Sequence, residues 1–394
     1  MNFVDALILV LLLAAAWSGY RRGFVNSSIA LVGAVGGAVV GVRLAPLLMN
    51  HVTDSAAKVA VGIAVVIVGV GIGEIAGATV GHALSERLTW RPARTVDHGL
   101  GLIGNTIAVL IVTWMIAIPL ASAPYPWMAS SVRSSSVLAA VDNVMPDSVR
   151  NVSTRMRQLF DDSGFPEILD PLAPTPDVDV SPPDATLSAA PALRTAGLSV
   201  LKVRGAAPAC SRQIEGSGFV IAPGKLMTNA HVVAGTNRLS VQQGNTRLTA
   251  TVVVFDPNRD LAVLDVPGLT RPALTFAARA GRAGQSVAAA GYPLDGPFTI
   301  TPGRIRSEIT LNGPNIYSST TVTRDVFTLR ANVRAGNSGG PLLAGDGTVL
   351  GVIFGAAIDK PDIGFALTAE EAAPVVAAGL VDDTAAATGS CTAD

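Results

Sequence analysis

The sequence has few charged residues, few histidines and only two cysteines. Charged side chains make up 14% of the 394 residues, and the 28 basic residues almost balance the 29 acidic ones. Because the formal net charge is −1, no overall field attracts nucleic acid, and no nucleic-acid partner is expected. The histidines and cysteines are too few and too dispersed to predict a metal site, and no cofactor is expected.

Apolar residues are abundant instead, at 49% of the chain, and they concentrate in its first third. Four stretches there are nearly free of charge, and an α-helix needs about 20 residues to cross the hydrocarbon core of a bilayer. We therefore predict a four-helix transmembrane bundle within residues 1–123, in contact with the lipid bilayer. The predicted spans are Val4–Trp17, Ile29–Leu48, Val59–Leu84 and Leu100–Ala121.

The first span is short, so a cleaved signal peptide is the alternative interpretation. A signal peptide carries its positive charges before the apolar region and ends at a small-residue cleavage site. Here Arg21 and Arg22 follow the apolar region, and no such site is present. The sequence therefore favours a retained span.

Glycines recur at every fourth residue of the second and third spans, which places each set on one helix face. Such faces let two backbones approach closely, so we expect the helices to pack through them. Glu74 lies among the glycines of the third span, where an ionisable side chain is costly. It is either a functional group or a protonated or hydrogen-bonded structural glutamate. The glycines are Gly33, Gly37 and Gly41, then Gly69, Gly73, Gly77 and Gly81.

Basic residues in the short loops predict the orientation of the bundle. Arg21 and Arg22 follow the first span, and Arg87, Arg91 and Arg94 lie between the third and fourth. By the positive-inside rule both loops face the cytoplasm. Four crossings then leave the remainder of the chain outside the cytoplasm.

The composition changes twice after the bundle. Residues 124–196 are predicted to form a linker rich in proline and alanine, and the spacing of apolar residues in its first part is compatible with an amphipathic helix. Residues 197–394 contain short β-type runs separated by glycine and proline, enough for two small barrels. The runs are LSVLKV, GSGFVI, LSVQQ, LTATVVVF, LAVLDV, SVAAAGY, VFTLRANV, TVLGVIFG and IGFALT.

One histidine lies in this β-rich region, His231 in "LMTNAHVVAG". A catalytic histidine needs a carboxylate to hold its tautomer and to stabilise its cation. Asp260 begins an apolar run and can be buried behind the ring, whereas Asp256 begins a turn and Asp265 lies within the strand pattern. We therefore select Asp260, with a purely structural histidine as the alternative.

The segment "AGNSGGPLL" places Ser338 among glycines. Taken alone, such a segment is an ordinary glycine-rich turn. The order His231, Asp260, Ser338 is, however, the order of the triad in chymotrypsin-type proteases.

The motifs "TNAHVV", "DLAVLDV" and "GNSGGPL" resemble those of trypsin-like proteases of the HtrA kind, as do "GSGFVIAPGKLMTNAHVV" and "GYPLDGPFTITPGRI". The resemblance covers Leu198–Leu367 and implies an all-β chymotrypsin-like double β-barrel with two perpendicular six-stranded barrels. It implies Ser338 as nucleophile, His231 as general base and then acid, and Asp260 as the orienting group. The turn Gly336, Asn337, Ser338 would form the oxyanion hole, with the backbone N–H groups of Gly336 and Ser338 as donors.

The same resemblance places Asn332 at the base of the primary specificity pocket, with room left by Ala356 and Ala357. Asn332 is neutral and offers no strong attraction for lysine or arginine, so a preference for medium apolar residues is expected. HtrA proteases continue into a PDZ domain, whereas 56 residues follow Ser338 here.

The opening "MNFVDALILVLLLAAAWSGYRRGFV" resembles the colicin V production family of four-span membrane proteins over about residues 1–125. A four-span module before such a protease domain resembles the membrane-anchored periplasmic serine proteases that actinobacteria use in acid resistance. This resemblance implies a serine endopeptidase that acts on protein or peptide substrates of the cell envelope under stress. We expect the protease domain to be monomeric.

Cys210 and Cys391 are predicted to form a disulfide, because a cysteine pair in an oxidising compartment is more often bridged than free.

Two alternative functions, from other classes than a protease, stay open. One is a non-catalytic membrane scaffold or sensor on a protease fold. The other is a transporter or channel that uses Glu74 and is regulated by the β domain.

Overall fold

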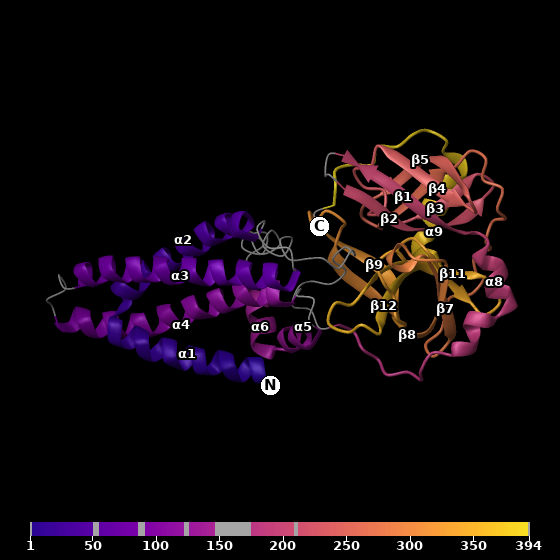
Figure 1. Cartoon of the computed structure of the whole chain (residues 1–394). Coiled ribbons are helices and arrows are strands. Elements are labelled where there is room, and N and C mark those ends of the chain that lie inside the picture. Colours follow the sequence, from indigo (N-terminus) through magenta and orange to yellow (C-terminus); the bar gives the residue numbers. More distant parts are fainter. Residues whose placement is uncertain are drawn as a thin grey trace. The chain divides into compact units, whose positions relative to one another are not determined.

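The computed structural model describes residues 2–49, 55–85, 91–121, 126–145, 175–208 and 212–392. They form two compact units, Met1–Asp161 and Asp162–Asp394 (Figure 1). The boundaries predicted after residues 123 and 196 differ from this division and stay predictions.

The first unit is helical, and four of its helices are long and apolar enough to cross a membrane, which confirms the four predicted spans by length and composition. The second span begins earlier than predicted, at Phe24. The helices are α1 (Phe3–Arg22), α2 (Phe24–Met49), α3 (Ser55–Ser85), α4 (Arg91–Ala121), α5 (Pro126–Arg133) and α6 (Ser136–Val144).

Helices α2 and α3 pack through the glycine faces that the sequence predicts. A Cβ atom added at Gly33 would lie 2.1 Å from the carbonyl oxygen of Gly73, and one added at Gly37 would lie 2.0 Å from that of Gly69. No side chain fits between backbones this close. The glycines therefore allow the contact, in agreement with the prediction.

The beginning of α1 is tied to the helices that follow α4. The buried carboxylate of Asp5 accepts hydrogen bonds from Ser135 Oγ at 2.6 Å and from the backbone N–H of Val137 at 3.2 Å. Asn2 Nδ2 donates to the carbonyl oxygen of Ser131 at 2.6 Å. The first part of the predicted linker thus forms α5 and α6, which pack on the bundle.

Glu74 has a partner of opposite charge. Its Oε1 lies 3.3 Å from Nη1 of Arg22, and both side chains are about half exposed. This pairing favours the structural interpretation of Glu74 over the functional one. Arg87 lies outside the described residues.

The second unit contains two six-stranded sheets, each closed into a barrel (Figure 1). The first barrel has the order β1-β2-β3-β6-β5-β4 and the second β10-β11-β12-β9-β8-β7. The first comprises β1 (Val200–Ala207), β2 (Arg212–Ala222), β3 (Lys225–Thr228), β4 (Arg238–Gln243), β5 (Thr246–Asp256) and β6 (Leu261–Asp265). The second comprises β7 (Ser286–Gly291), β8 (Thr299–Pro314), β9 (Thr321–Arg330), β10 (Pro341–Ala344), β11 (Val349–Ala356) and β12 (Ile363–Thr368).

One hydrophobic cluster joins the two barrels. It contains Phe219 and Met227 of the first barrel together with Phe354 and Phe365 of the second, all fully buried. Burial of each such side chain contributes about 1.5–3 kcal/mol, so the shared core holds the two barrels in one arrangement. The other helices within the described residues are η1 (Ala185–Ala189), α8 (Pro191–Gly197), η3 (Pro293–Asp295) and α9 (Ala369–Val381).

The last part of the predicted linker packs along the second barrel. Nη1 of Arg306 donates to Asp177 Oδ1 at 2.6 Å, and Nη1 of Arg330 donates to the carbonyl oxygen of Val180 at 2.5 Å. These contacts add residues before β1 to the protease unit.

Candidate active site

His231 lies in the turn after β3, and the pairing of β3 with β6 brings it next to Asp260. Thr228 at the end of β3 pairs with Ala262 near the start of β6. Across this junction Asp260 Oδ1 accepts the backbone N–H of His231 at 2.9 Å, and Asp260 Oδ2 lies 2.7 Å from Nδ1 of the ring. Both residues are buried, and the structure brings them together.

The turn before β6 fixes the position of Asp260. Its φ of 57° is in the left-handed region, which aspartate and asparagine tolerate better than most residues. Asn229 Nδ2 donates to the carbonyl oxygen of Asp260 at 2.7 Å. Asp256 Oδ1 closes the turn by accepting the backbone N–H groups of Asn258 and Arg259 at 3.0 and 2.9 Å.

A buried arginine holds the same turn from the second barrel. Arg324 on β9 donates to the carbonyl oxygen of Asn258 at 2.7 Å and to that of Pro314 at 2.8 Å. Burial lowers the pKa of its guanidinium, while the negative charge of Asp260 acts in the opposite direction. Sequence reasoning missed Arg324, because no local signal links β9 to this turn.

Ser338 lies in the turn between β9 and β10, next to the turn of His231. Its carbonyl oxygen accepts the N–H of Ser217 on β2 at 2.8 Å. A Cβ atom at Gly216 would lie 2.7 Å from Val232 Cγ1 and 3.2 Å from the carbonyl oxygen of Ser338. Gly216 therefore lies between Ser338 and Val232, the residue after His231, and leaves no room there for a side chain.

The hydroxyl of Ser338 and the ring of His231 are not hydrogen-bonded to each other. Ser338 Oγ and His231 Nε2 are both buried, and neither has a partner among the described residues. Such hydrogen bonds often tighten only when substrate binds. We therefore keep Ser338 and His231 as a candidate pair.

The turn before Ser338 presents two backbone donors. Gly336 has a φ of 89°, and a Cβ atom there would lie 2.3 Å from the carbonyl oxygen of Tyr292. Among the described residues the N–H groups of Gly336 and Ser338 have no acceptor, whereas the N–H of Asn337 donates to the carbonyl oxygen of Arg334 at 3.0 Å. The turn itself uses the N–H of Asn337, so Gly336 and Ser338 are its candidate oxyanion donors, and the oxyanion hole stays a prediction.

Ser217 also holds this turn, although the sequence analysis did not single it out. Its Oγ donates to the carbonyl oxygen of Gly336 at 2.6 Å and accepts the N–H of Tyr292 at 2.9 Å. The only signal in the sequence is its place within "GSGFVI".

The residues expected at the specificity pocket lie in different surroundings. Asn332 is exposed, and its Oδ1 accepts from Nε of Arg334 at 3.3 Å. Its place at the base of the specificity pocket therefore stays a prediction. Ala335 and Ala356 pack against one apolar cluster that also contains Val333.

The chain end packs on the turn that follows His231. A Cβ atom at Gly235 would lie 2.8 Å from Cys391 Sγ, and the N–H of Gly235 donates to the carbonyl oxygen of Thr388 at 3.0 Å. Cys210, the predicted partner of Cys391, lies outside the described residues.

Two family models match the chain. The model described as trypsin-like peptidase domain matches residues 216–352, and the model described as Colicin V production protein matches residues 4–146. The second match includes α1 and extends through α6, and thus beyond the predicted limit of about residue 125.

Sequence and structure comparisons agree with these models. The serine protease Rv3671c of Mycobacterium tuberculosis is 41% identical over 374 residues, 94% of each chain. A probable periplasmic serine endoprotease, DegP-like, of Halomonas elongata is 36% identical over 148 residues, 36% of this chain and 29% of that protein. The crystal structure of the Rv3671c protease in its active form matches with a TM-score of 0.54 and 48% identity, and covers 57% of this chain and 99% of that one.

The relationship to Rv3671c extends over both units, and the trypsin-like domain has the double-barrel fold. The chain therefore belongs to the family of membrane-anchored serine proteases that join a Colicin V production module to a trypsin-like, HtrA-related peptidase domain.

Proposed function

We propose that Ser338, His231 and Asp260 hydrolyse peptide bonds as a catalytic triad. The observation that carries this proposal is the 2.7 Å contact between Asp260 Oδ2 and Nδ1 of His231. An aspartate at Nδ1 holds the proton there and leaves Nε2 free to act as the base.

In the proposed reaction Ser338 Oγ attacks the scissile carbonyl carbon, and its proton passes to His231 Nε2. The N–H groups of Gly336 and Ser338 stabilise the oxyanion of the tetrahedral intermediate. When the intermediate collapses, the C–N bond breaks and the amine takes the proton from Nε2. Water then hydrolyses the acyl-enzyme through the same sequence of steps.

A fluorophosphonate probe tests the proposal against a non-catalytic scaffold or sensor. The probe forms a covalent adduct with an activated serine, so the full-length protein should be labelled on the peptide that contains Ser338. The His231→Ala variant should be labelled far more slowly, because the base is missing. An unlabelled wild-type protein would favour the scaffold.

We further propose that the protease unit lies in the periplasm. Arg21 and Arg22 at the end of α1 support this orientation under the positive-inside rule. A reporter that is active only in the periplasm should be active when fused after Ala196 and inactive when fused between α3 and α4. The opposite pattern would reverse the topology.

In that compartment we propose a Cys210–Cys391 disulfide, because two cysteines in an oxidising compartment are more often bridged than free. It would close a loop of roughly 180 residues, for which chain entropy gives at most about 5 kcal/mol. A mass shift of the peptide that contains Cys391 on reduction would identify the bridge.

The proposed substrates are envelope proteins cleaved after medium apolar residues, because Ala335 and Ala356 pack in apolar surroundings. Arg334 nearby is exposed and disfavours a basic side chain at this position. Profiling of cleavage sites with a peptide library tests the preference.

A role in acid and envelope stress is proposed from the family resemblance and the anchoring of a protease in the membrane. A deletion strain should lose survival in acidic medium, and wild-type protein but not Ser338→Ala should restore it. The alternative of a transporter or channel predicts a flux through the reconstituted protein that depends on Glu74.

A further inference from the structure

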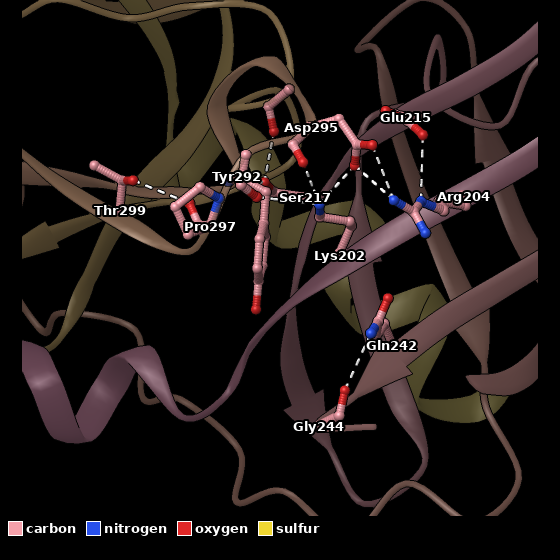
Figure 2. A network of polar contacts seen from close by, with 12 residues as sticks. Lys202, Arg204, Glu215, Ser217, Gln242, Gly244, Tyr292, Asp295, Pro297 and Thr299 are labelled. Atoms are coloured by element: carbon pink, nitrogen blue, oxygen red, sulfur yellow. Dashed lines mark hydrogen bonds and ion pairs between the residues drawn. The ribbon is translucent and has the colours of Figure 1, made fainter. Parts of the chain in front are cut away.

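A cluster of charged residues joins the first barrel to the loop between β7 and β8. Asp295 in η3 accepts hydrogen bonds from Lys202 Nζ at 2.5 Å and from Arg204 Nη2 at 2.8 and 2.9 Å. Glu215 Oε1 lies 3.2 Å from Nε of Arg204. Figure 2 shows the Asp295 carboxylate in contact with both basic side chains, with Glu215 beside it and in contact with the same Arg204 side chain.

Lys202 also holds the backbone of this loop. Its Nζ donates to the carbonyl oxygens of Asp295 at 2.7 Å and of Gly296 at 3.1 Å, and it lies 5.2 Å from the centre of the Tyr292 ring. With the carboxylate contact, three oxygens surround one ammonium group whose side chain is only 11% exposed. The loop is thus fastened to β1 by both its side chain and its main chain.

The fastened segment has an unfavourable backbone conformation. Leu294 and Asp295 have φ values of 54° and 55°, a region that residues other than glycine seldom adopt. Two consecutive residues of this kind persist only where surrounding contacts hold them. Lys202 and Arg204 provide such contacts, because both hold the side chain of Asp295.

The same segment fixes a peptide group of the candidate oxyanion hole. The N–H of Leu294 donates to the carbonyl oxygen of Ala335 at 2.7 Å. This carbonyl and the N–H of Gly336 belong to one planar trans peptide, so they point in opposite directions. A hydrogen bond that holds the oxygen of Ala335 therefore also sets the direction of the Gly336 N–H.

We propose that Asp295 is a positioning residue for the oxyanion hole. By holding Asp295 against β1, Lys202 and Arg204 place the N–H of Leu294 where it keeps the Gly336 N–H directed at the oxyanion. Without this contact the segment relaxes from its left-handed conformation, and the Ala335–Gly336 peptide is free to rotate. The inference rests on the proposed function, since it needs Ser338 as nucleophile and Gly336 as donor.

The charge state of the cluster fits this role. The hydrogen bond from Lys202, followed by that from Arg204, lowers the pKa of Asp295 to about 2. The carboxylate is therefore ionised wherever the protease works near neutral or moderately acidic pH. Burial, with repulsion from Asp295, raises the pKa of Glu215.

The Asp295→Asn variant of the full-length protein tests the proposal. Asparagine keeps the shape and tolerates the left-handed φ, so the change removes mainly the charge. We expect kcat per titrated active site to fall by about 10²-fold, as for loss of an oxyanion donor, with KM within about twofold of wild type. Affinity for a peptidyl boronic acid, whose tetrahedral adduct places an oxygen in the oxyanion hole, should fall by the same factor as kcat/KM.

Two further variants complete the design. Arg204→Gln keeps the contact of Lys202 with Asp295, so kcat and boronic acid affinity should fall by less than in Asp295→Asn. This variant replaces Asp295→Asn in the test if the latter does not fold. Asp383→Asn is the matched control, because Asp383 is an exposed aspartate that also lies 2.5 Å from a lysine, Lys225 of β3. It should keep wild-type kcat and boronic acid affinity.

The outcomes separate this inference from the proposed function. Wild-type kcat and boronic acid affinity in both Asp295→Asn and Arg204→Gln overturn the positioning role. A rise in KM alone, or a loss explained by fewer titrated sites, overturns it equally, because either result indicates a structural contact. If the boronic acid inhibits Ser338→Ala as strongly as wild type, the proposed nucleophile is wrong.

Discussion

The carboxylate of Asp260 holds His231 at two points, accepting the backbone N–H at 2.9 Å and contacting Nδ1 of the ring at 2.7 Å. One oxygen fixes the turn and the other fixes the ring. The position of the turn and the orientation of the His231 ring therefore depend on a single side chain.

Replacing Asp260 by asparagine should lower kcat by about 10⁴-fold, the loss associated with the wrong histidine tautomer in serine proteases. Asparagine tolerates the φ of 57° at this position, so the fold should persist. Peptide hydrolysis and circular dichroism measure the two effects. Asp265→Asn is the control, because Asp265 lies 3.3 Å from Lys225 and does not contact His231.

Gly336→Ala should lower kcat by about 10²–10³-fold with a much smaller change in KM, because it displaces one oxyanion donor. Its Cβ would lie 2.3 Å from the carbonyl oxygen of Tyr292, at a φ that disfavours alanine. Gly345→Ala should leave both constants unchanged, since its nearest contact is 3.7 Å away. Equal effects of the two changes would refute a special role for Gly336.

Packing of the membrane unit can be tested apart from catalysis. Gly73→Ala places a Cβ 2.0 Å from the carbonyl oxygen of Gly33 and should force α2 and α3 apart, which lowers the temperature at which the detergent-solubilised protein aggregates. Gly71→Ala should have no such effect, because among the described residues no atom outside the backbone of its own helix lies within 4 Å of its Cβ. A similar loss for both alanines would contradict packing through the glycine faces.

The contact of Asp295 with Lys202 should give the protease unit a stability that depends on pH. Its pKa is lowered to about 2 in the folded protein, and an unfolded aspartate titrates near 3.9. The contribution is therefore complete above about pH 4 and disappears as the pH falls toward 2.

Asp295→Asn should accordingly inactivate faster than wild type near neutral pH, and the difference should shrink as the pH falls through about 4 toward 2. Residual activity after incubation at each pH, assayed after return to neutrality, provides the measurement. A difference that does not change with pH would show that the charge of Asp295 is not involved.

Much of this architecture could be predicted from the sequence because its signals are local. Each quoted β-type run overlaps a strand, and a β-branched or apolar run bounded by glycine is a short-range pattern. Strand β8 was not predicted, because Pro302 and Gly303 interrupt its pattern although both residues pair with β7.

In the candidate site, too, the residues in local motifs could be predicted and the contacts between distant residues could not. His231, Asp260 and Ser338 lie in motifs that can be recognised one at a time. The contacts that support them join residues far apart in the chain, such as Leu294 with Ala335 and Lys202 with Asp295. The spacing of apolar residues in the sequence does not predict such pairs, because they depend on how the two barrels and their loops pack together.

The most direct measurement of the central claim is kcat/KM for wild type and for Ser338→Ala in the full-length protein, with a peptide chosen by cleavage profiling. Loss of one buried hydroxyl should leave the fold intact, and turnover should drop below about a thousandth of wild type. Residual hydrolysis above that level, in a preparation free of wild-type protein, would place the nucleophile elsewhere and contradict the triad of His231, Asp260 and Ser338.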